Sequence, residues 1–136
     1  MRMWTGVAGR LISQWMIAAG ISLFTNLTNV QAQATPQATP QATQEIKGLL
    51  DFVEHSECQF VRNGDEFPGP RARAHLEKKL NYLEGKNMVH SAEDFIDLAA
   101  TGSSMSGRAY EVRCPEGAES ARTWLMRELQ RQRQLH

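Results

Sequence analysis

The stretch that decides the fold is C-Q-F-V-R-N-G-D-E-F, residues 58–67. At its centre Asn63-Gly64 lies between two extended, apolar-rich runs. A type I′ turn needs a positive φ at both central residues, and Asn followed by Gly meets this need at low steric cost. The stretch therefore predicts a β-hairpin, with one strand at 58–62 and a short return strand that ends at Phe67.

Another strand is predicted at 108–114, where apolar and charged side chains alternate. If it pairs antiparallel with 58–62, its last residue, Cys114, lies beside Cys58. In an exported protein an even number of cysteines favours a disulfide. Strand register and cysteine count thus indicate the same bond, and closing so long a loop contributes about 4 kcal/mol to the free energy of unfolding.

Apolar side chains at helical spacing predict four helices around this sheet. Thr43 is the expected N-cap of the first helix, and Ser91 with Asp94 resembles a capping box at the start of the third. Gly85 is expected just after the second helix. The fold class is α+β, with a small, mainly antiparallel sheet (the hairpin plus a third strand), about four helices and one disulfide. The expected helices are 45–57, 71–84, 92–100 and a last one from 121, with a turn at 115–119.

The N-terminal segment, residues 1–32, is predicted to be a signal peptide. Arg2 and Arg10 precede an apolar run at 11–27, and the small-residue site Val-Gln-Ala ends at Ala32. The alternative is a retained membrane anchor, but polar residues interrupt the run. Cleavage near Ala32 would leave a periplasmic or secreted product.

Three copies of a Q-A-T repeat, mostly followed by proline, occupy residues 33–44. This segment lacks large apolar side chains, so we expect a flexible tether. A single domain is then expected at 45–131, followed by a frayed tail at 132–136.

Charge and composition exclude several classes of partner. All 15 acidic residues but only 13 of the 15 basic ones follow residue 32, so the cleaved chain carries a formal charge of −2. This balance argues against nucleic acid, which requires a basic excess. Contact with a membrane is expected only through an uncleaved signal segment. The scattered histidines predict no metal site, and no motif indicates a cofactor.

Several polar residues mark a candidate site. Arg62 borders the turn, while His75 and Lys79 lie four residues apart at the edge of the buried face of their helix. The loop at 101–107 is rich in serine and glycine, and its amides could hold an anion. A purely structural interpretation is favoured for each residue. The serines of this loop are Ser103, Ser104 and Ser106.

Four motifs, taken in order, resemble the YfeK-like family of small exported bacterial proteins of unknown function. They are F-V-R-N-G-D at 60–65, A-x-x-H-L-x-x-K at 72–79, S-A-E-D-F-I-D at 91–97 and S-S-M-S-G-R-A-Y-x-V at 103–112. The resemblance implies an envelope or periplasmic location and a single compact domain, but no reaction. It also implies further site candidates, namely Asn63, Glu93 and Tyr110.

The favoured function is that of a non-enzymatic envelope protein, binding or structural, with a shallow polar site near Arg62 and the serine loop. Its partner would be an unidentified envelope protein or a small anionic ligand. One alternative is a small hydrolase that uses Ser104 or Ser106 with His75. A second alternative is an inhibitor or partner-docking module.

Overall fold

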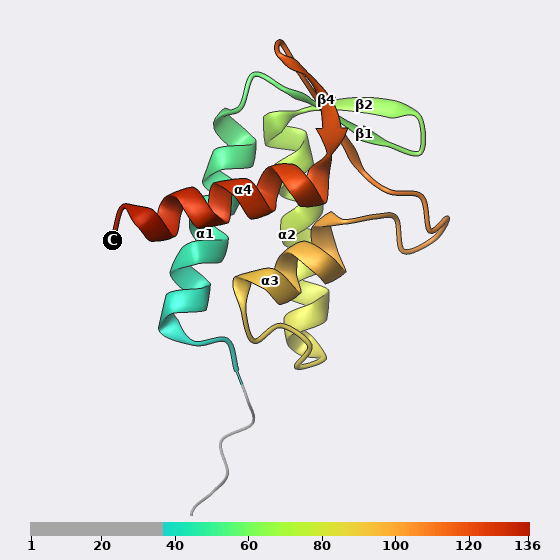
Figure 1. The fold of residues 1–136 in the computed structure, drawn as a ribbon. Coiled ribbons are helices and arrows are strands. Elements are labelled where there is room, and N and C mark those ends of the chain that lie inside the picture. Colours follow the sequence, from blue (N-terminus) through green and yellow to red (C-terminus); the bar gives the residue numbers. More distant parts are fainter. Residues whose placement is uncertain (1–36) are drawn as a thin grey trace, which may run out of the picture. The chain divides into compact units, whose positions relative to one another are not determined.

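The computed structural model describes residues 37–136. The predicted signal peptide at 1–32, its cleavage site near Ala32 and the first residues of the predicted tether, 33–36, lie outside the described residues. In Figure 1 the strands gather at one end of the domain and the helices extend from them. This arrangement confirms the predicted α+β class.

The hairpin forms as predicted. Strand β1 (Gln59–Arg62) pairs antiparallel with β2 (Asp65–Pro68). Asn63 has a φ of 52° and Gly64 a φ of 91°, so both central residues are left-handed, as the turn requires.

The disulfide is also confirmed. Strand β3 (Glu111–Cys114) pairs antiparallel with β1, with Gln59 opposite Arg113. Cys58 and Cys114 are the neighbours of this residue pair, so the register places them side by side, and they form a disulfide. The strand is shorter than the predicted range 108–114.

A fourth strand, β4 (Gly117–Ser120), was not predicted. It pairs antiparallel with β3, and the sheet order is β2-β1-β3-β4. The interpretation of 115–119 as a turn is therefore wrong, because the turn occupies only Pro115 and Glu116. None of the four residues of β4 is buried, so the strand lacks an apolar signal.

Helix α1 (Pro40–His55) begins five residues earlier than predicted, inside the segment assigned to the tether. Its N-cap is Thr39, not Thr43, and the Thr39 hydroxyl accepts a hydrogen bond from the amide of Ala42 at 3.1 Å. Pro40 fits the first helical position because that residue needs no amide donor. Ala42 is buried, so the end of the repeat belongs to the folded domain.

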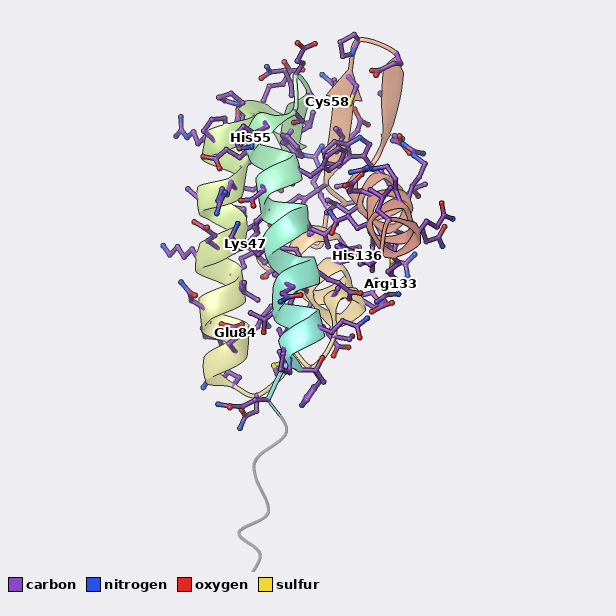
Figure 2. The ribbon with its side chains drawn as sticks, turned by 90° about the vertical axis from the view of Figure 1, so that its left-hand side faces the viewer. Lys47, His55, Cys58, Glu84, Arg133 and His136 are labelled. Atoms are coloured by element: carbon purple, nitrogen blue, oxygen red, sulfur yellow. A yellow bond between two sulfur atoms is a disulfide. The ribbon has the colours of Figure 1, made fainter. Side chains whose placement is uncertain are left out.

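Helix α2 (Gly69–Gly85) lies beside α1, as Figure 2 shows. It begins with Gly69, where a Cβ atom would lie 2.5 Å from the carbonyl oxygen of Val53. A larger residue would therefore push the two helices apart. At the other end Gly85 is still helical, and Asn87, with a φ of 54°, takes the left-handed position expected of Gly85.

Helix α3 (Ala92–Phe95) starts with the predicted capping box, in which Ser91 and Asp94 bond each other's backbone amides. It continues as a π-helical turn, η1 (Ile96–Ala100). The Thr101 hydroxyl donates to the Ile96 carbonyl at 2.8 Å and closes this turn. The predicted end near Ala100 is confirmed.

Helix α4 (Ala121–Gln134) is capped by Ser120, as expected. The predicted frayed tail at 132–136 is wrong for residues 132–134, which are helical. Arg133 explains the difference, because it contacts both Glu45 on α1 and Glu93 on α3. None of the described helices is long and apolar enough to cross a membrane.

Candidate functional site

Four polar side chains from distant parts of the sequence meet between the sheet and α2. Arg62 is the last residue of β1, and Tyr110 directly precedes β3, the neighbour of β1 in the sheet. His75 and Lys79 lie one turn apart on α2. Leu76, between them on the helix, is buried in the core, so its packing fixes which way both polar side chains point.

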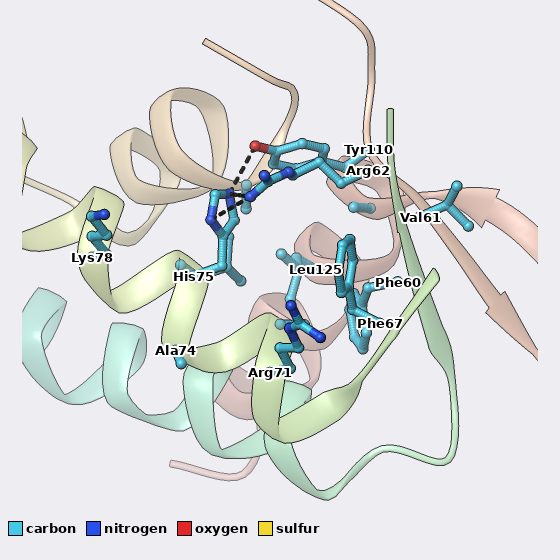
Figure 3. Close-up of a pocket in the computed structure, with 14 residues that line it drawn as sticks. Phe60, Val61, Arg62, Phe67, Arg71, Ala74, His75, Lys78, Tyr110 and Leu125 are labelled. Atoms are coloured by element: carbon cyan, nitrogen blue, oxygen red, sulfur yellow. Dashed lines mark hydrogen bonds between the residues drawn. The ribbon is translucent and has the colours of Figure 1, made fainter. Parts of the chain in front are cut away.

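His75 uses both nitrogens of its ring. Arg62 Nη1 lies 2.8 Å from Nδ1 and 3.3 Å from Nε2, and the Tyr110 hydroxyl lies 3.1 Å from Nε2 (Figure 3). A guanidinium can only donate, so Nδ1 accepts the shorter bond and the ring proton lies on Nε2. Nε2–H then donates to the Tyr110 oxygen, and the imidazole is neutral.

The surroundings of His75 favour this neutral form. Burial lowers the pKa of His75 below its ordinary value of 6.5, and the positive charges of Arg62, Lys79 and Lys78 lower it further. All three neighbours would repel an imidazolium. His75 is therefore an uncharged acceptor for Arg62 at neutral pH.

Lys79 is partly buried and donates to the carbonyl oxygen of Gly102 at 2.8 Å. Its Nζ also lies 3.5 Å from the Tyr110 hydroxyl and 5.1 Å from the centre of the Tyr110 ring. Burial lowers the pKa of Lys79, and the charge of Arg62 lowers it further. Burial also raises the pKa of Tyr110, so this phenol keeps its proton.

A pocket of about 360 Å³ opens beside this cluster, between the β1–β2 hairpin and the first half of α2 (Figure 3). Small-molecule sites typically measure about 300–1,000 Å³, so the pocket is large enough for a small ligand. Its charged side chains are all basic, namely Arg62, Arg71 and Lys78. Its apolar lining includes Phe60, Phe67, Leu76 and Leu125.

Two of these cations differ from most arginines of the domain. Within residues 37–136, six arginines each form a salt bridge with a carboxylate. Arg62 and Arg71 have no such partner in this part of the chain. Both instead approach the Phe67 ring, with Cζ atoms 5.8 Å and 5.0 Å from its centre. The pocket therefore holds positive charge that no described carboxylate neutralises.

The site lies in a chain segment that matches a known sequence family. Residues 40–133, which include all described elements except the last residue of α4, match the profile described as "Family of unknown function (DUF5329)". The match covers more than half of the chain. The chain belongs to the DUF5329 family.

A curated relative supports the same assignment and confirms the predicted YfeK-like resemblance. The uncharacterized protein YfeK of Salmonella typhimurium is 37% identical over 66 residues, which are 48% of this chain and 53% of the relative. The match thus spans about half the length of that relative. No solved structure matches the chain.

The serine loop of this DUF5329 domain forms a second cluster, next to the hairpin turn. Ser106 Oγ donates to Asn63 Oδ1 at 2.6 Å, and Asn63 Nδ2 lies 3.5 Å from Ser103 Oγ. The buried Ser103 Oγ also accepts from the amides of Met105 and Ser106, each at 3.3 Å. Two of the loop amides that the sequence offered to an anion thus donate to Ser103, and the loop contacts the hairpin turn through Asn63.

The arrangement proposed for a hydrolase is not present among the described residues. His75 bonds Arg62 and Tyr110, and no hydrogen bond joins it to Ser104 or Ser106. Ser104 is exposed, and the Ser106 hydroxyl is turned toward Asn63. A serine nucleophile needs a base within hydrogen-bond reach, which neither serine has here.

Glu93, a candidate from the family resemblance, lies elsewhere. It forms a salt bridge with Arg133 of α4, and the hydrogen bond from Arg133 lowers its pKa. Its position is therefore explained by the docking of α4. Within residues 37–136 no group of three His, Cys, Asp or Glu side chains is placed to hold a metal ion.

Sequence reasoning missed Arg71, Lys78 and Phe67. Arg71 and Lys78 lie four residues before and three residues after His75, so all three share one face of α2. This spacing was visible in the sequence. Phe67 gave no such signal, because its approach to Arg71 depends on how the hairpin packs against the helix.

Proposed function

We propose that this domain is a non-enzymatic binding domain that takes a small anion into the pocket between the β1–β2 hairpin and α2. The observation that carries the proposal is the pair Arg62 and Arg71, which line the pocket and have no described carboxylate partner. An anion bound there would supply the missing negative charge.

The hydrogen bonds of the cluster support this proposal. Arg62 donates one N–H group to His75, and its other N–H groups can donate to a ligand. Charge-assisted bonds from a guanidinium to an oxyanion are among the strongest in proteins, and they can form in pairs. Arg62 is partly buried, so water screens such a bond less than it would at an open surface.

We further propose that the domain works in the bacterial envelope after export. Two observations support this location. The sequence of residues 1–32 has the basic start, apolar run and small-residue site of a signal peptide. The Cys58–Cys114 disulfide is typical of proteins in an oxidising compartment. Cell fractionation, followed by N-terminal sequencing of the product, would test both parts of the proposal.

The anion proposal is tested by NMR titration at low ionic strength. We expect acetate, phosphate or sulfate to shift the amide and side-chain signals of Arg62 and Arg71 more than chloride does. Arg62→Gln should weaken binding about tenfold or more, since a hydrogen bond between charged groups contributes about 1.5–3 kcal/mol.

Arg108→Gln is the matched control. Arg108 also lacks a carboxylate partner within residues 37–136, but it is exposed and does not line the pocket. The proposal is wrong if no anion shifts the pocket signals, or if Arg108→Gln weakens binding as much as Arg62→Gln does.

A further inference from the structure

The lining of the pocket, in addition to its charge, restricts the kind of ligand that it can bind. Most of its lining is apolar, with the rings of Phe60 and Phe67 on the strands and Leu76 and Leu125 on the helices. Phe60, Leu76 and Leu125 also belong to the buried core, so the pocket reaches from the basic rim to the core itself. A fully hydrated inorganic anion would leave this apolar surface uncovered.

The polar side chains of the pocket can only donate hydrogen bonds to a ligand, because their acceptor atoms are already used within the cluster. Tyr110 Oη accepts a hydrogen bond from His75 Nε2, 3.1 Å away, and lies 3.5 Å from Lys79 Nζ. The phenol proton therefore remains free to donate to a ligand. The acceptor nitrogen of His75 already takes a bond from Arg62. Among residues 37–136, no Asp, Glu, Asn, Gln, Ser or Thr lines the pocket. Ligands whose polar groups must also donate, such as sugars and amines, therefore find no side-chain acceptor.

The volume limits the apolar part of the ligand. At about 360 Å³ the pocket is near the lower end of the range for small-molecule sites. One short hydrocarbon chain fits this space better than the two acyl chains of a phospholipid. An oxyanion head would remain at the rim, beside Arg62 and Arg71.

We infer, on the basis of the anion-binding function proposed above, that the ligand is a single-chain anionic amphiphile, with an oxyanion at one end of one hydrocarbon chain. The head accepts hydrogen bonds from Arg62 and from the free Tyr110 hydroxyl. The chain lies against Phe67 and the apolar wall behind it. Such a ligand satisfies the donors and covers the apolar surface at the same time.

Calorimetric titration with straight-chain carboxylates, from acetate to decanoate and below the concentrations at which they aggregate, tests this inference. We expect affinity to rise about fourfold for each added methylene until the pocket is full. Alkyl trimethylammonium ions of equal chain length should not bind, and vesicles of a two-chain anionic phospholipid should not retain the protein.

Two variants of pocket residues test separately what the charged head of the ligand and its hydrocarbon chain contribute to affinity. Arg62→Gln should weaken binding of every carboxylate by the same factor. Phe67→Ala should reduce the gain per methylene and leave acetate binding nearly unchanged. Tyr82→Ala is the control, because Tyr82 is a 66% exposed aromatic residue on α2 that does not line the pocket. Thermal melting of each variant verifies that it is folded.

Each contrary result has a distinct meaning. If acetate binds but longer chains bind no tighter, this inference is wrong and the anion-binding function stands. If no carboxylate of any length binds, this inference is wrong, and the anion-binding function is wrong as well if phosphate and sulfate also fail to bind. Equal binding of the alkyl trimethylammonium ions, or binding to the phospholipid vesicles alone, would also overturn the single-chain anionic ligand.

Discussion

Arg62 and His75 form a hydrogen bond in which a permanently charged guanidinium donates to a neutral imidazole, with Arg62 Nη1 2.8 Å from Nδ1. A protonated imidazole has no free nitrogen lone pair, so protonation of His75 would break this bond. The same event would place a new positive charge beside Arg62, Lys79 and Lys78. Protonation of His75 would therefore release Arg62 from its partner at the pocket rim.

Acid should destabilise the domain through His75. Its pKa in the folded protein lies below the ordinary value of 6.5, so the unfolded chain binds the proton more readily. The stability that depends on the neutral ring is complete above pH 6.5 and is lost as pH falls through the folded pKa. Urea unfolding across pH 4–8 should show this loss in the native protein but not in His75→Gln.

The cause of the shift can be tested separately by NMR. Arg62→Gln removes one of the positive charges that lower the pKa of His75, so the pKa should rise in that variant. Arg108→Gln, a change at an exposed residue directly after the serine loop, should leave it unchanged. A His75 pKa that is the same in all three proteins would contradict the proposed electrostatic coupling.

A bound anion should have the opposite effect on His75 to that of its basic neighbours. A negative charge at the pocket rim favours the imidazolium, so saturating octanoate should raise the pKa of His75. By linkage, octanoate should then bind more tightly as pH falls through the pKa of the free protein. Octanol, which has the same chain and no charge, is the control and should leave the titration of His75 unmoved.

The fold was predictable where the signals were local. Asn63-Gly64 specified the turn, and strand alternation then placed Cys114 next to Cys58. The fourth strand was missed because β4 is an exposed edge strand without a buried side chain. The start of α1 was missed because the repeat looked uniform, although its last copies supply a cap and a buried alanine.

The candidate site was predictable only in part. Arg62 stood out because it borders the turn, and His75 and Lys79 because they lie at the edge of an apolar helix face; the structure brings the three together. Whether these side chains form salt bridges with carboxylates depends on tertiary contacts, which a sequence pattern does not specify. Glu93 illustrates this limit, since it was grouped with the site but lies against Arg133 instead.

The two threonines at the start of α1 provide a direct test of where the helix begins. Thr39→Ala removes the N-cap bond to Ala42 and should lower the free energy of unfolding by about 1 kcal/mol. Thr43, the cap expected from the sequence, lies within the helix, so Thr43→Ala should change it by less than about 0.5 kcal/mol. Urea denaturation of both variants gives the comparison. A larger loss of unfolding free energy in Thr43→Ala would instead indicate that the helix begins after Thr43, as the sequence predicted.

The end of α4 can be tested by truncation. A chain that stops after Arg131 loses the contacts of Arg133 with Glu45 and Glu93, whereas one that stops after Gln134 keeps them. Arg133 is 40% exposed, so we expect a loss on the order of 1 kcal/mol for the shorter chain. Equal thermal stability of the two truncated chains would mean that these contacts do not hold the helix end.

The disulfide should contribute a large part of the stability of so small a domain. Cys58 and Cys114 are 56 residues apart, and closing a loop of this length restricts the unfolded chain by about 4 kcal/mol. The double variant Cys58→Ala/Cys114→Ala should therefore unfold at much lower urea concentration than the native protein. Reductant should destabilise the native protein and leave the double variant unaffected, which separates loss of the bond from a general effect of the reagent. Because the same bond fixes β3 against β1, and Tyr110 directly precedes β3, the double variant should also bind carboxylates more weakly. Unchanged unfolding in the double variant would show that strand pairing alone holds this end of the sheet.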